Sequence, residues 1–455
     1  MMNDDEVRSI VDTASLAQTE WRHASVQDRV DIVQAFLRYF EENADEVAND
    51  ITGQMGKPLA HARGEIRGMS ERAIAMMDLA PTALADYTLG ETTNNQDTEN
   101  FHRKIVREPV GVVLTLAPYN YPLLTAVNSI VPAVLAGNAV VVNHGFRTPL
   151  ISEHFERAFK AAGVPSGLVV SQKCEYDVLH KSIRAGLYDF VSFTGSVEGG
   201  TRVQESVAAC APKFIDCTLE LGGNDAAYVA EDANLDVAAA TVVDGALFNA
   251  GQSCCGMERA FVHESVYDEF LDRAREEFHS AYGKVGDPRA SETAMGPMAQ
   301  PTAIPALAEL VADAKAKGAT VILGGDTDDD AGITGPRIYN PTLLADCDAS
   351  MKVMFEESFG PVLAVQKVSS MDDAIRGVNA SKYGLTSAIF TQDESAASEY
   401  ASRVDVGTVF MNRADYLDPY MPWQGRKATG KGLSLSHHGF NAFTRLKNYH
   451  FKLVK

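Results

Sequence analysis

The run GVVLTL at residues 111–116 marks the point where the sequence pattern changes. Three more short apolar runs follow it: AVVV at 139–142, LVV at 168–170 and FVSF at 190–193. Stretches with helical spacing separate these runs. Parallel strands that are buried on both faces and joined by helices give this pattern. The sequence therefore predicts an α/β fold with a parallel sheet.

The segment between the second and third runs indicates how these strands are joined. Thr148 is a predicted N-cap, and Pro149 suits the first helical turn. Gly163 and Pro165 then end the helix. Its apolar face consists of Ile151, Phe155, Ala158, Phe159 and Ala162. This strand–helix–strand crossover is typical of dinucleotide-binding folds.

Length and composition describe a large globular chain. The 455 residues exceed what one hydrophobic core usually supports, so two or three structural units are expected. Hydrophobic residues make up 45% and charged residues 22%, which is ordinary for a globular protein and unlike a disordered chain. Residues 1–80 have mostly helical spacing.

Charge and cysteine usage exclude several classes of partner. The net charge of −21 argues against nucleic acid, because phosphate contacts need a basic stripe. An acidic start without an apolar run behind it, and the absence of 18 consecutive apolar residues, predict a cytoplasmic protein without membrane contact. The six cysteines are scattered, with neither a C-x-x-C pair nor nearby histidines, so reduced thiols and no metal site are expected.

An anion site is predicted after the fourth apolar run. The standard G-x-G-x-x-G loop does not follow the first run. Instead, Thr194, Gly195 and Ser196 stand where a strand ends and a helix begins. Backbone N–H groups at a helix start, with hydroxyls beside them, favour a phosphate oxygen. Such joins are also common turns.

Two polar segments stand out from ordinary core sequence. Cys254 lies in FNAGQSCC at 248–255, and Glu220 lies 34 residues earlier in LELGGN at 219–224. A thiol is nucleophilic only as the thiolate, so a reactive cysteine needs a base or an electropositive setting, and Glu220 can serve as a base. The alternative is that Cys254 is an inert buried thiol, as we expect for its neighbour Cys255.

These two segments, in this order and at this separation, resemble the signature segments of the aldehyde dehydrogenase superfamily. The resemblance extends over nearly the whole chain. It implies that Cys254 is the nucleophile and that Glu220 activates water. It also implies that Leu221 and the segment Thr194–Gly195–Ser196 contact a nicotinamide cofactor.

Other motifs carry the same resemblance. PYNYP at 118–122 is similar to the family motif whose asparagine holds an oxyanion, which implies that role for Asn120 and cofactor contacts for Pro118 and Tyr119. EESFGPV at 356–362 resembles the segment that contacts the nicotinamide ribose and ring, through Glu357 and Phe359. PWQGRKATG at 422–430 resembles a segment beside the substrate tunnel.

The sequence departs from the family pattern after the second run. Where the family usually has lysine and glutamate beside the adenosine ribose, this chain has Asn143 and Phe146. The neighbouring Arg147 can attract a 2′-phosphate. Either NAD or NADP is therefore the expected cofactor.

The resemblance implies an aldehyde dehydrogenase-like fold with a Rossmann-type cofactor domain at 1–96 and 110–219. A catalytic α/β domain is expected at 220–432 and a β oligomerisation arm at 97–109 and 433–455, with its last strand near 450–454. The expected assembly is a homodimer or a dimer of dimers. The expected reaction oxidises a small aldehyde to a carboxylate through a cysteine thiohemiacetal and thioester.

Alternatives remain open from the sequence alone. A CoA-acylating relative would transfer the acyl group to CoA, although Glu220 favours hydrolysis, and a cofactor-poor binding protein could use the same fold. Tyr121, Trp423 and Leu124 suggest an apolar or aromatic aldehyde, with Tyr416 and Tyr420 nearby. Asn128 and Arg413 suggest a semialdehyde instead, because they can hold a carboxylate.

Overall fold

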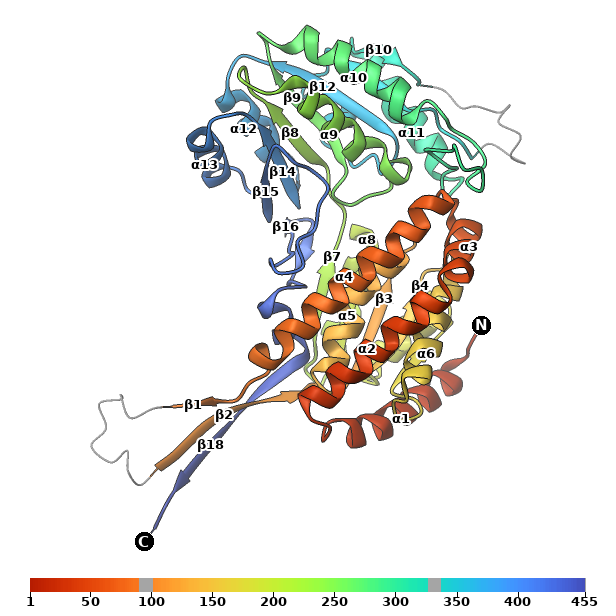
Figure 1. Ribbon diagram of the computed structural model, residues 1–455, viewed down its shortest axis with the longest axis vertical. Coiled ribbons are helices and arrows are strands. Elements are labelled where there is room, and N and C mark those ends of the chain that lie inside the picture. Colours follow the sequence, from red (N-terminus) through yellow and green to blue (C-terminus); the bar gives the residue numbers. More distant parts are fainter. Residues whose placement is uncertain (90–100, 326–336, 455) are drawn as a thin grey trace.

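Two α/β units lie one above the other, and a narrow ribbon of strands projects from the lower unit (Figure 1). The computed structural model describes residues 1–89, 101–325 and 337–454. Within these residues the lower unit contains a six-stranded sheet and the upper unit a seven-stranded sheet. The ribbon is a three-stranded sheet.

The lower sheet has the order β17-β7-β6-β3-β4-β5. Its strands are β3 (Val112–Ala117), β4 (Ala139–His144), β5 (Val169–Ser171), β6 (Phe190–Thr194), β7 (Asp216–Glu220) and β17 (Gly430–Lys431). All neighbours pair in parallel except β17, which is antiparallel to β7. The predicted parallel α/β sheet is confirmed, and the four apolar runs form β3 to β6.

Helices cover both faces of this sheet. The connections are α5 (Pro122–Leu135), α6 (Pro149–Ala162), α7 (Tyr176–Arg184) and α8 (Val197–Ala208). Strand order moves outward from β3 to β5 and then returns to β6, so right-handed crossovers place α5 and α6 on one face and α7 and α8 on the other. The carboxyl ends of β3 and β6 form the crevice where such folds bind ligands.

The predicted cap at Thr148 is wrong in one respect, because its buried hydroxyl makes no capping bond.

Four long helices precede the sheet: α1 (Asp4–Trp21), α2 (Val26–Glu42), α3 (Ala44–Met55) and α4 (Leu59–Ala83). Helix α1 packs against β4 and α7, whereas α2 and α4 pack over α5 and α6. The indole of Trp21 donates to the carbonyl oxygen of Val134 at 2.9 Å. The helical spacing of the first eighty residues thus produces a layer over both faces of the sheet.

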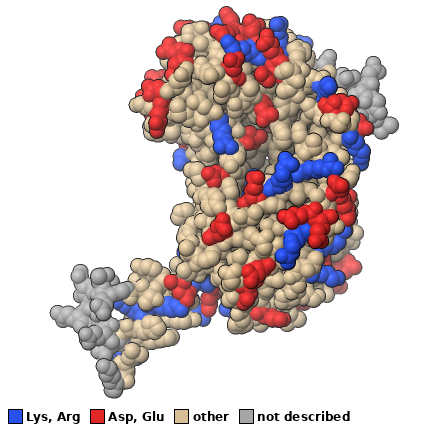
Figure 2. Space-filling view, in the orientation of Figure 1, with Lys and Arg blue, Asp and Glu red and all other residues tan. Residues whose placement is uncertain are grey.

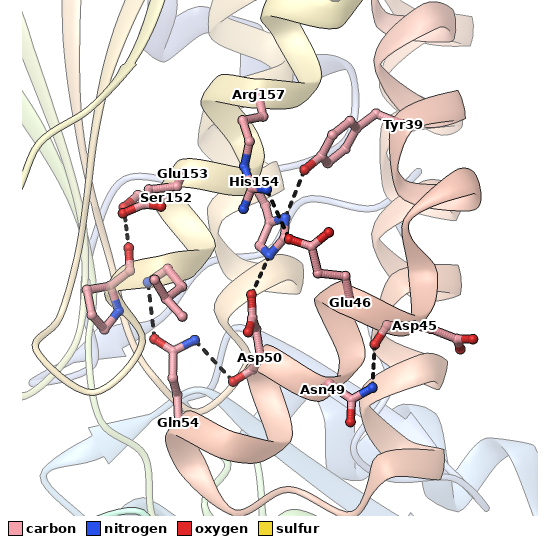
Figure 3. Close-up of polar contacts among 12 residues, drawn as sticks. Tyr39, Asp45, Glu46, Asn49, Asp50, Gln54, Ser152, Glu153, His154 and Arg157 are labelled. Atoms are coloured by element: carbon pink, nitrogen blue, oxygen red, sulfur yellow. Dashed lines mark hydrogen bonds and ion pairs between the residues drawn. The ribbon is translucent and has the colours of Figure 1, made fainter.

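Polar contacts fix α2, α3 and α6 to one another (Figure 3). His154 Nε2 donates to Asp50 at 2.8 Å, and Tyr39 donates to His154 Nδ1 at 3.0 Å. Arg157 pairs with Glu46 at 3.0 Å. In the described ranges, Glu46, Asp50 and His154 are the one group whose ligand atoms lie close enough together to hold a metal ion. All three side chains already bond to other protein groups, so the cluster links the three helices to one another.

The upper sheet has the order β10-β11-β12-β9-β8-β14-β15. Its strands are β8 (Asp225–Val229), β9 (Met257–His263), β10 (Thr320–Leu323), β11 (Thr342–Ala345), β12 (Val362–Val368), β14 (Thr386–Phe390) and β15 (Thr408–Met411). Its helices are α9 (Leu235–Leu247), α10 (Tyr267–Tyr282), α11 (Ala303–Ala316), α12 (Met371–Asn379) and α13 (Glu394–Arg403). Short 3₁₀ turns lie at η2 (Phe248–Gly251), η3 (Lys352–Met354) and η4 (His437–Phe443), and β13 (Tyr383–Gly384) pairs with β16 (Arg426–Lys427).

The projecting ribbon consists of β1 (Tyr87–Thr88), β2 (Phe101–Pro109) and β18 (Thr444–Lys452). Strands β2 and β18 pair antiparallel along their whole length. The predicted last strand at 450–454 begins earlier than expected and ends at Lys452. Of the predicted arm segments, residues 97–100 and 455 lie outside the described residues. Strand β17 comes from the predicted catalytic range yet joins the lower sheet, and the domain boundaries stay a prediction.

Acidic and basic side chains are intermingled on the face shown in Figure 2. Among the described residues, no helix is both long and apolar enough to cross a membrane.

Candidate active site

The predicted site residues meet where the two units join. The loop after β3 contacts the loop that leads into β9, and the loop between β7 and β8 contacts the loop that leads into β12. A cavity of about 250 Å³ lies at this junction. It is lined by Arg72, Tyr121, Leu124, Thr125, Asn128, Thr194, Glu220, Asp244, Phe248, Ser253, Cys254, Cys255, Asp415, Leu417 and Trp423. Segments of both units therefore form one site.

The loop before Cys254 has an unusual backbone. Asn249, Ala250 and Gly251 all have positive φ values, of 56°, 57° and 67°. For a residue with a side chain this conformation is strained, and such strain tends to gather at functional sites. At Gly223 the chain approaches so closely that a side chain would overlap the carbonyl oxygen of Cys254. The two signature segments thus touch through their backbones, and Cys254 is left half-buried in the cavity wall.

Glu220 is the last residue of β7 and lies opposite Gly430 of β17. One carboxylate oxygen accepts a hydrogen bond from the Ser434 hydroxyl at 2.5 Å. Burial raises the pKa of Glu220, while the bond from Ser434 and the charge of Arg72 oppose that rise. A raised pKa brings a carboxylate closer to the range where it can take a proton from water at neutral pH.

Asn120 follows β3 and connects the lower unit to the cysteine loop. Its side-chain amide donates to the carbonyl oxygen of Gln252 at 3.0 Å, and Asn249 donates to the carbonyl oxygen of Asn120 at 3.0 Å. Asn120 itself is buried. These two bonds hold the amide beside the loop that carries Cys254.

Cys255 does not simply point into packing, as the sequence suggested. Its thiol donates to Asp415 at 2.9 Å, and it lines the cavity. Its hydrogen bond with Cys254 and then its burial raise the pKa of Cys255 well above the usual range for a thiol. Burial also raises the pKa of Asp415, to about 6. Cys255 is therefore held as a neutral thiol, which makes it the poorer nucleophile of the two.

The sequence did not reveal a buried ion pair that supports this wall. Lys57 and Glu65 pair with each other and are almost completely buried. Glu65 also accepts from the backbone N–H groups of Leu123 and Leu124, at 2.8 and 3.3 Å, at the start of α5. The Lys57 ammonium lies 4.1 Å from the centroid of the Tyr121 ring. The only signal in the sequence was a glutamate at helical spacing in α4, which normally indicates a solvated face.

The predicted cofactor residues lie along the edges of the same junction. Ser196 caps α8, with its hydroxyl accepting from Gly199 at 3.1 Å, and Thr194 lines the cavity. Leu221 is buried. Pro118 and Tyr119 follow β3 and are half-buried.

Glu357 and Phe359 close the site from the upper unit. Glu357 accepts from the backbone of Gly223 at 2.9 Å, and burial together with the charge of Glu258 raises its pKa to about 8. The ring of Phe359 meets that of Tyr119 edge-on, with centroids 6.3 Å apart.

This edge fits a nicotinamide dinucleotide. It offers a partly buried carboxyl group for hydroxyl donors, two aromatic walls for a ring, and a capped helix start for phosphate. All three features lie at the carboxyl-end crevice of a doubly wound sheet.

The departures from the family pattern also have a place in the fold. Asn143 is buried near the end of β4, where it donates to the His144 carbonyl oxygen at 3.2 Å and accepts from the Cys174 thiol at 3.8 Å. Phe146 is exposed and meets the ring of Tyr176 edge-on at 4.9 Å. Arg147 is also exposed. Neutral and aromatic groups thus replace charged ones at this edge.

Most of the predicted substrate residues line the cavity: Tyr121, Leu124, Asn128 and Trp423. Arg413 does not. It is exposed, and its guanidinium lies 3.2 Å from the centroid of the Tyr416 ring. The structure instead brings Arg72 of α4 into the cavity wall, which the sequence analysis missed. A lone arginine in a helix of mixed charge carries no sequence signal of its own.

A thiol, a carboxylate and a crevice suited to a dinucleotide, all at one junction, are the groups that a dehydrogenase with a cysteine nucleophile requires. The model of the aldehyde dehydrogenase family matches residues 1–449, so the chain belongs to this family. The predicted family, fold class and enzyme class, an NAD(P)-dependent aldehyde dehydrogenase, are confirmed.

Named relatives agree with this assignment. The succinate semialdehyde dehydrogenase [NAD(P)+] Sad of Escherichia coli K12 is 31% identical over 97% of this chain and 92% of its own length. The succinate-semialdehyde dehydrogenase [NADP(+)] of Deinococcus radiodurans is 33% identical over 97% and 89%. A solved succinate-semialdehyde dehydrogenase from Burkholderia pseudomallei has a TM-score of 0.92 at 29% identity, covering 99% of this chain and 91% of that one.

Proposed function

We propose that this chain oxidises a small aldehyde to its carboxylate with Cys254 as the nucleophile and Glu220 as the base. One observation carries the proposal. The two side chains come from different units, yet both lie in the wall of a single cavity. A cysteine nucleophile and a carboxylate that can activate water are the two groups that this reaction requires.

In the first step the Cys254 sulfur adds to the aldehyde carbon, and the carbonyl oxygen becomes an oxyanion. The Asn120 amide has two N–H groups, of which one is bonded to Gln252, so the other can donate to that oxygen. A preorganised donor of this kind contributes about 3 to 4 kcal/mol of transition-state stabilisation.

A nicotinamide cofactor bound at this edge would supply the acceptor for the hydride of the thiohemiacetal carbon, which would leave an acyl group on sulfur. Glu357, Phe359 and Tyr119 would hold its nicotinamide end, and the start of α8 with Thr194 would hold its phosphates. Pro118 and Leu221 would form walls beside it. Phe146 and Arg147 would lie towards its adenosine end. NAD and NADP both remain in the proposal, since the E. coli relative is named for either.

Glu220 then takes a proton from water, whose oxygen attacks the acyl carbon. The carbon–sulfur bond breaks, the carboxylate leaves, and Cys254 returns as thiolate. Hydrolysis is favoured over transfer to CoA because a partly buried carboxylate, held by Ser434, stands in the cavity. The cofactor-poor alternative is disfavoured by the intact set of acceptor and aromatic groups at the cofactor edge.

The test is replacement of the nucleophile. Cys254→Ala should abolish steady-state reduction of NAD or NADP by aldehyde while the circular dichroism spectrum stays unchanged. Cys255→Ala should keep turnover within a few-fold, because that thiol is held neutral. Cys347→Ala, which removes another buried thiol of the upper unit, is the control. Full activity in Cys254→Ala would refute the assignment.

Three further proposals concern the domains, the assembly and the location of the protein. We propose cofactor and catalytic domains with the boundaries given above, a homodimer or dimer of dimers joined through the ribbon of β2 and β18, and a cytoplasmic location. The ribbon supports the proposed assembly, because it exposes large apolar side chains: Leu446 is 63% exposed and Phe451 is 52% exposed.

A further inference from the structure

Two adjacent thiols line the catalytic cavity in the described part of the chain. Cys254 is half-buried, Cys255 is buried, and both belong to the same cavity wall. The two thiols are hydrogen-bonded to each other. Groups that interact this closely lose their protons as a pair, and two neighbouring thiolates would repel each other. The reactive state therefore has one thiolate, and the position of the remaining proton decides which sulfur is the nucleophile.

Asp415 contacts the residues on both sides of Cys254. Its Oδ1 atom accepts from the Cys255 thiol at 2.9 Å and from the Ser253 hydroxyl at 3.3 Å. The Ser253 oxygen also lies 3.5 Å from the Cys255 sulfur. An ionised carboxylate only accepts hydrogen bonds, so the hydrogen in the bond to Cys255 belongs to that thiol.

The backbone at Asp415 is held in a strained conformation. Asp415 lies in the loop after β15, and its φ of 45° is in the left-handed region. Strain of this kind persists only where the surrounding structure enforces it, and it gathers at functional sites. The strained residues 249–251 lead to Cys254 from the other side. Two strained segments therefore meet at the pair of thiols.

Charge acts in the same direction as this hydrogen bond. Burial raises the pKa of Asp415 to about 6, and the bond from Cys255 opposes that rise. At neutral pH the carboxyl group is therefore mostly ionised. The pKa of Cys255 is raised first by its bond with Cys254, then by burial and then by the charge of Asp415. A carboxylate beside a nucleophilic thiol would ordinarily oppose its ionisation, but here it is bonded to the neighbouring thiol.

We propose that Asp415 is a positioning residue that keeps the proton on Cys255 and so leaves the thiolate to Cys254. Asp415 acts through Cys255 and not on the substrate. The bond to Ser253 holds the carboxylate against the cysteine loop while it does so. This inference rests on the proposed function, because it takes Cys254 as the reacting thiol.

The first test measures which thiol reacts. A limiting dose of iodoacetamide should label the wild type almost entirely at Cys254, as read by tandem mass spectrometry, which distinguishes adjacent residues. In Asp415→Ala the ratio of Cys255 to Cys254 labelling should rise by about tenfold or more, the range for a lost hydrogen bond to a charged group. Asp415→Asn keeps the shape and an acceptor but loses the charge, so its ratio should lie between the two.

Asp418→Asn is the matched control, because Asp418 is an exposed aspartate of the same loop. It should leave the labelling ratio unchanged. Wild-type labelling mainly at Cys255 would count against the proposed function. Labelling at Cys254 with the same ratio in the wild type and both Asp415 variants would overturn this inference alone.

A second test uses the oxidation of an aldehyde, measured as kcat/KM. Asp415→Ala should lower kcat/KM by about threefold to tenfold, because Cys255 then shares the negative charge and less of Cys254 is thiolate. Removing the competing thiol should reverse this loss. The double variant, Asp415→Ala with Cys255→Ala, should recover most of the kcat/KM that Asp415→Ala loses. A double variant no more active than Asp415→Ala would show a merely structural role for Asp415 and would overturn the proposal.

Discussion

Burial controls the ionisation of the carboxyl groups around the reacting thiol. It raises the pKa of Glu220, raises that of Asp415 to about 6, and is the largest cause of the rise of Glu357 to about 8. A general base works best when its pKa lies near the operating pH. Burial at the junction thus moves the pKa of Glu220 toward the range that suits proton transfer.

The role of Glu220 predicts a specific kinetic trace. Glu220→Gln should slow release of the acyl group more than its formation, because an amide cannot take a proton from water. Stopped-flow mixing should then show a fast burst of reduced nicotinamide, close to one per site, followed by a slow phase. Equal loss of burst and steady-state rates would mean that Glu220 acts before hydride transfer.

The raised pKa of Glu357 predicts pH-dependent cofactor binding. Below about pH 8 the carboxyl group is largely protonated, and it must ionise to accept two hydroxyl donors. The affinity for NAD or NADP should therefore increase as pH rises from 6.5 to 8.5, by at most about tenfold per unit, and then level off. Titration calorimetry should show a much flatter profile for Glu357→Gln. An equally steep profile in that variant would assign the dependence to another group.

At the scale of elements, the start of α5 is the most heavily supported point of the site. Glu65 caps its backbone from α4, and His144 of β4 donates to the Pro122 carbonyl oxygen at 2.9 Å. Helix α5 carries Leu124 and Asn128 into the cavity. Two elements, α4 and β4, therefore hold α5 and with it one side of the cavity before substrate arrives.

Loss of Lys57 should destabilise this point. Lys57→Met leaves the Glu65 carboxylate buried without its cation, which costs about 3 to 5 kcal/mol. The midpoint of thermal unfolding should fall by several degrees. Arg63→Met, which removes the exposed pair with Asp45, should leave the midpoint within about a degree. Similar midpoints for the two variants would contradict the stabilising role of the buried pair.

Local sequence predicted the strands better than it predicted the cavity. The apolar runs that became β3 to β6 could be found from local pattern alone, because β3 and β4 are buried along their whole length and β5 and β6 are partly buried. Arg72 and Glu65 could not be found in this way, because the local sequence of one helix does not show which residues of other helices will contact it. Arg413 shows the reverse error: its neighbouring motif suggested the cavity, but the chain turns it outward onto Tyr416.

At the scale of the whole molecule, the ribbon is a thin extension that a single chain supports poorly. Small sheets of few strands are marginally stable alone, and this one exposes large apolar side chains. A second copy of the chain is the proposed cover.

A charge on the ribbon should disrupt the assembly. Leu446→Asp places a carboxylate on a leucine that is 63% exposed, and sedimentation velocity should then show a shift toward smaller species. Leu16→Asp is the control, because Leu16 of α1 is 76% exposed and lies outside the ribbon. An unchanged sedimentation profile for Leu446→Asp would place the interface elsewhere.

The pairing of β2 with β18 also sets the order in which the nascent chain can mature. Strand β2 and Glu220 are translated long before their partners. Strand β18 completes the ribbon, and Ser434 holds the proposed base. At roughly 5 to 20 residues per second, β2 waits on the order of half a minute on the ribosome for its partner. During that interval it presents an unpaired edge, which is the kind of surface that chaperones protect. A chain interrupted before Ser434 would carry the nucleophile, but it would lack both the support for its base and the means to assemble.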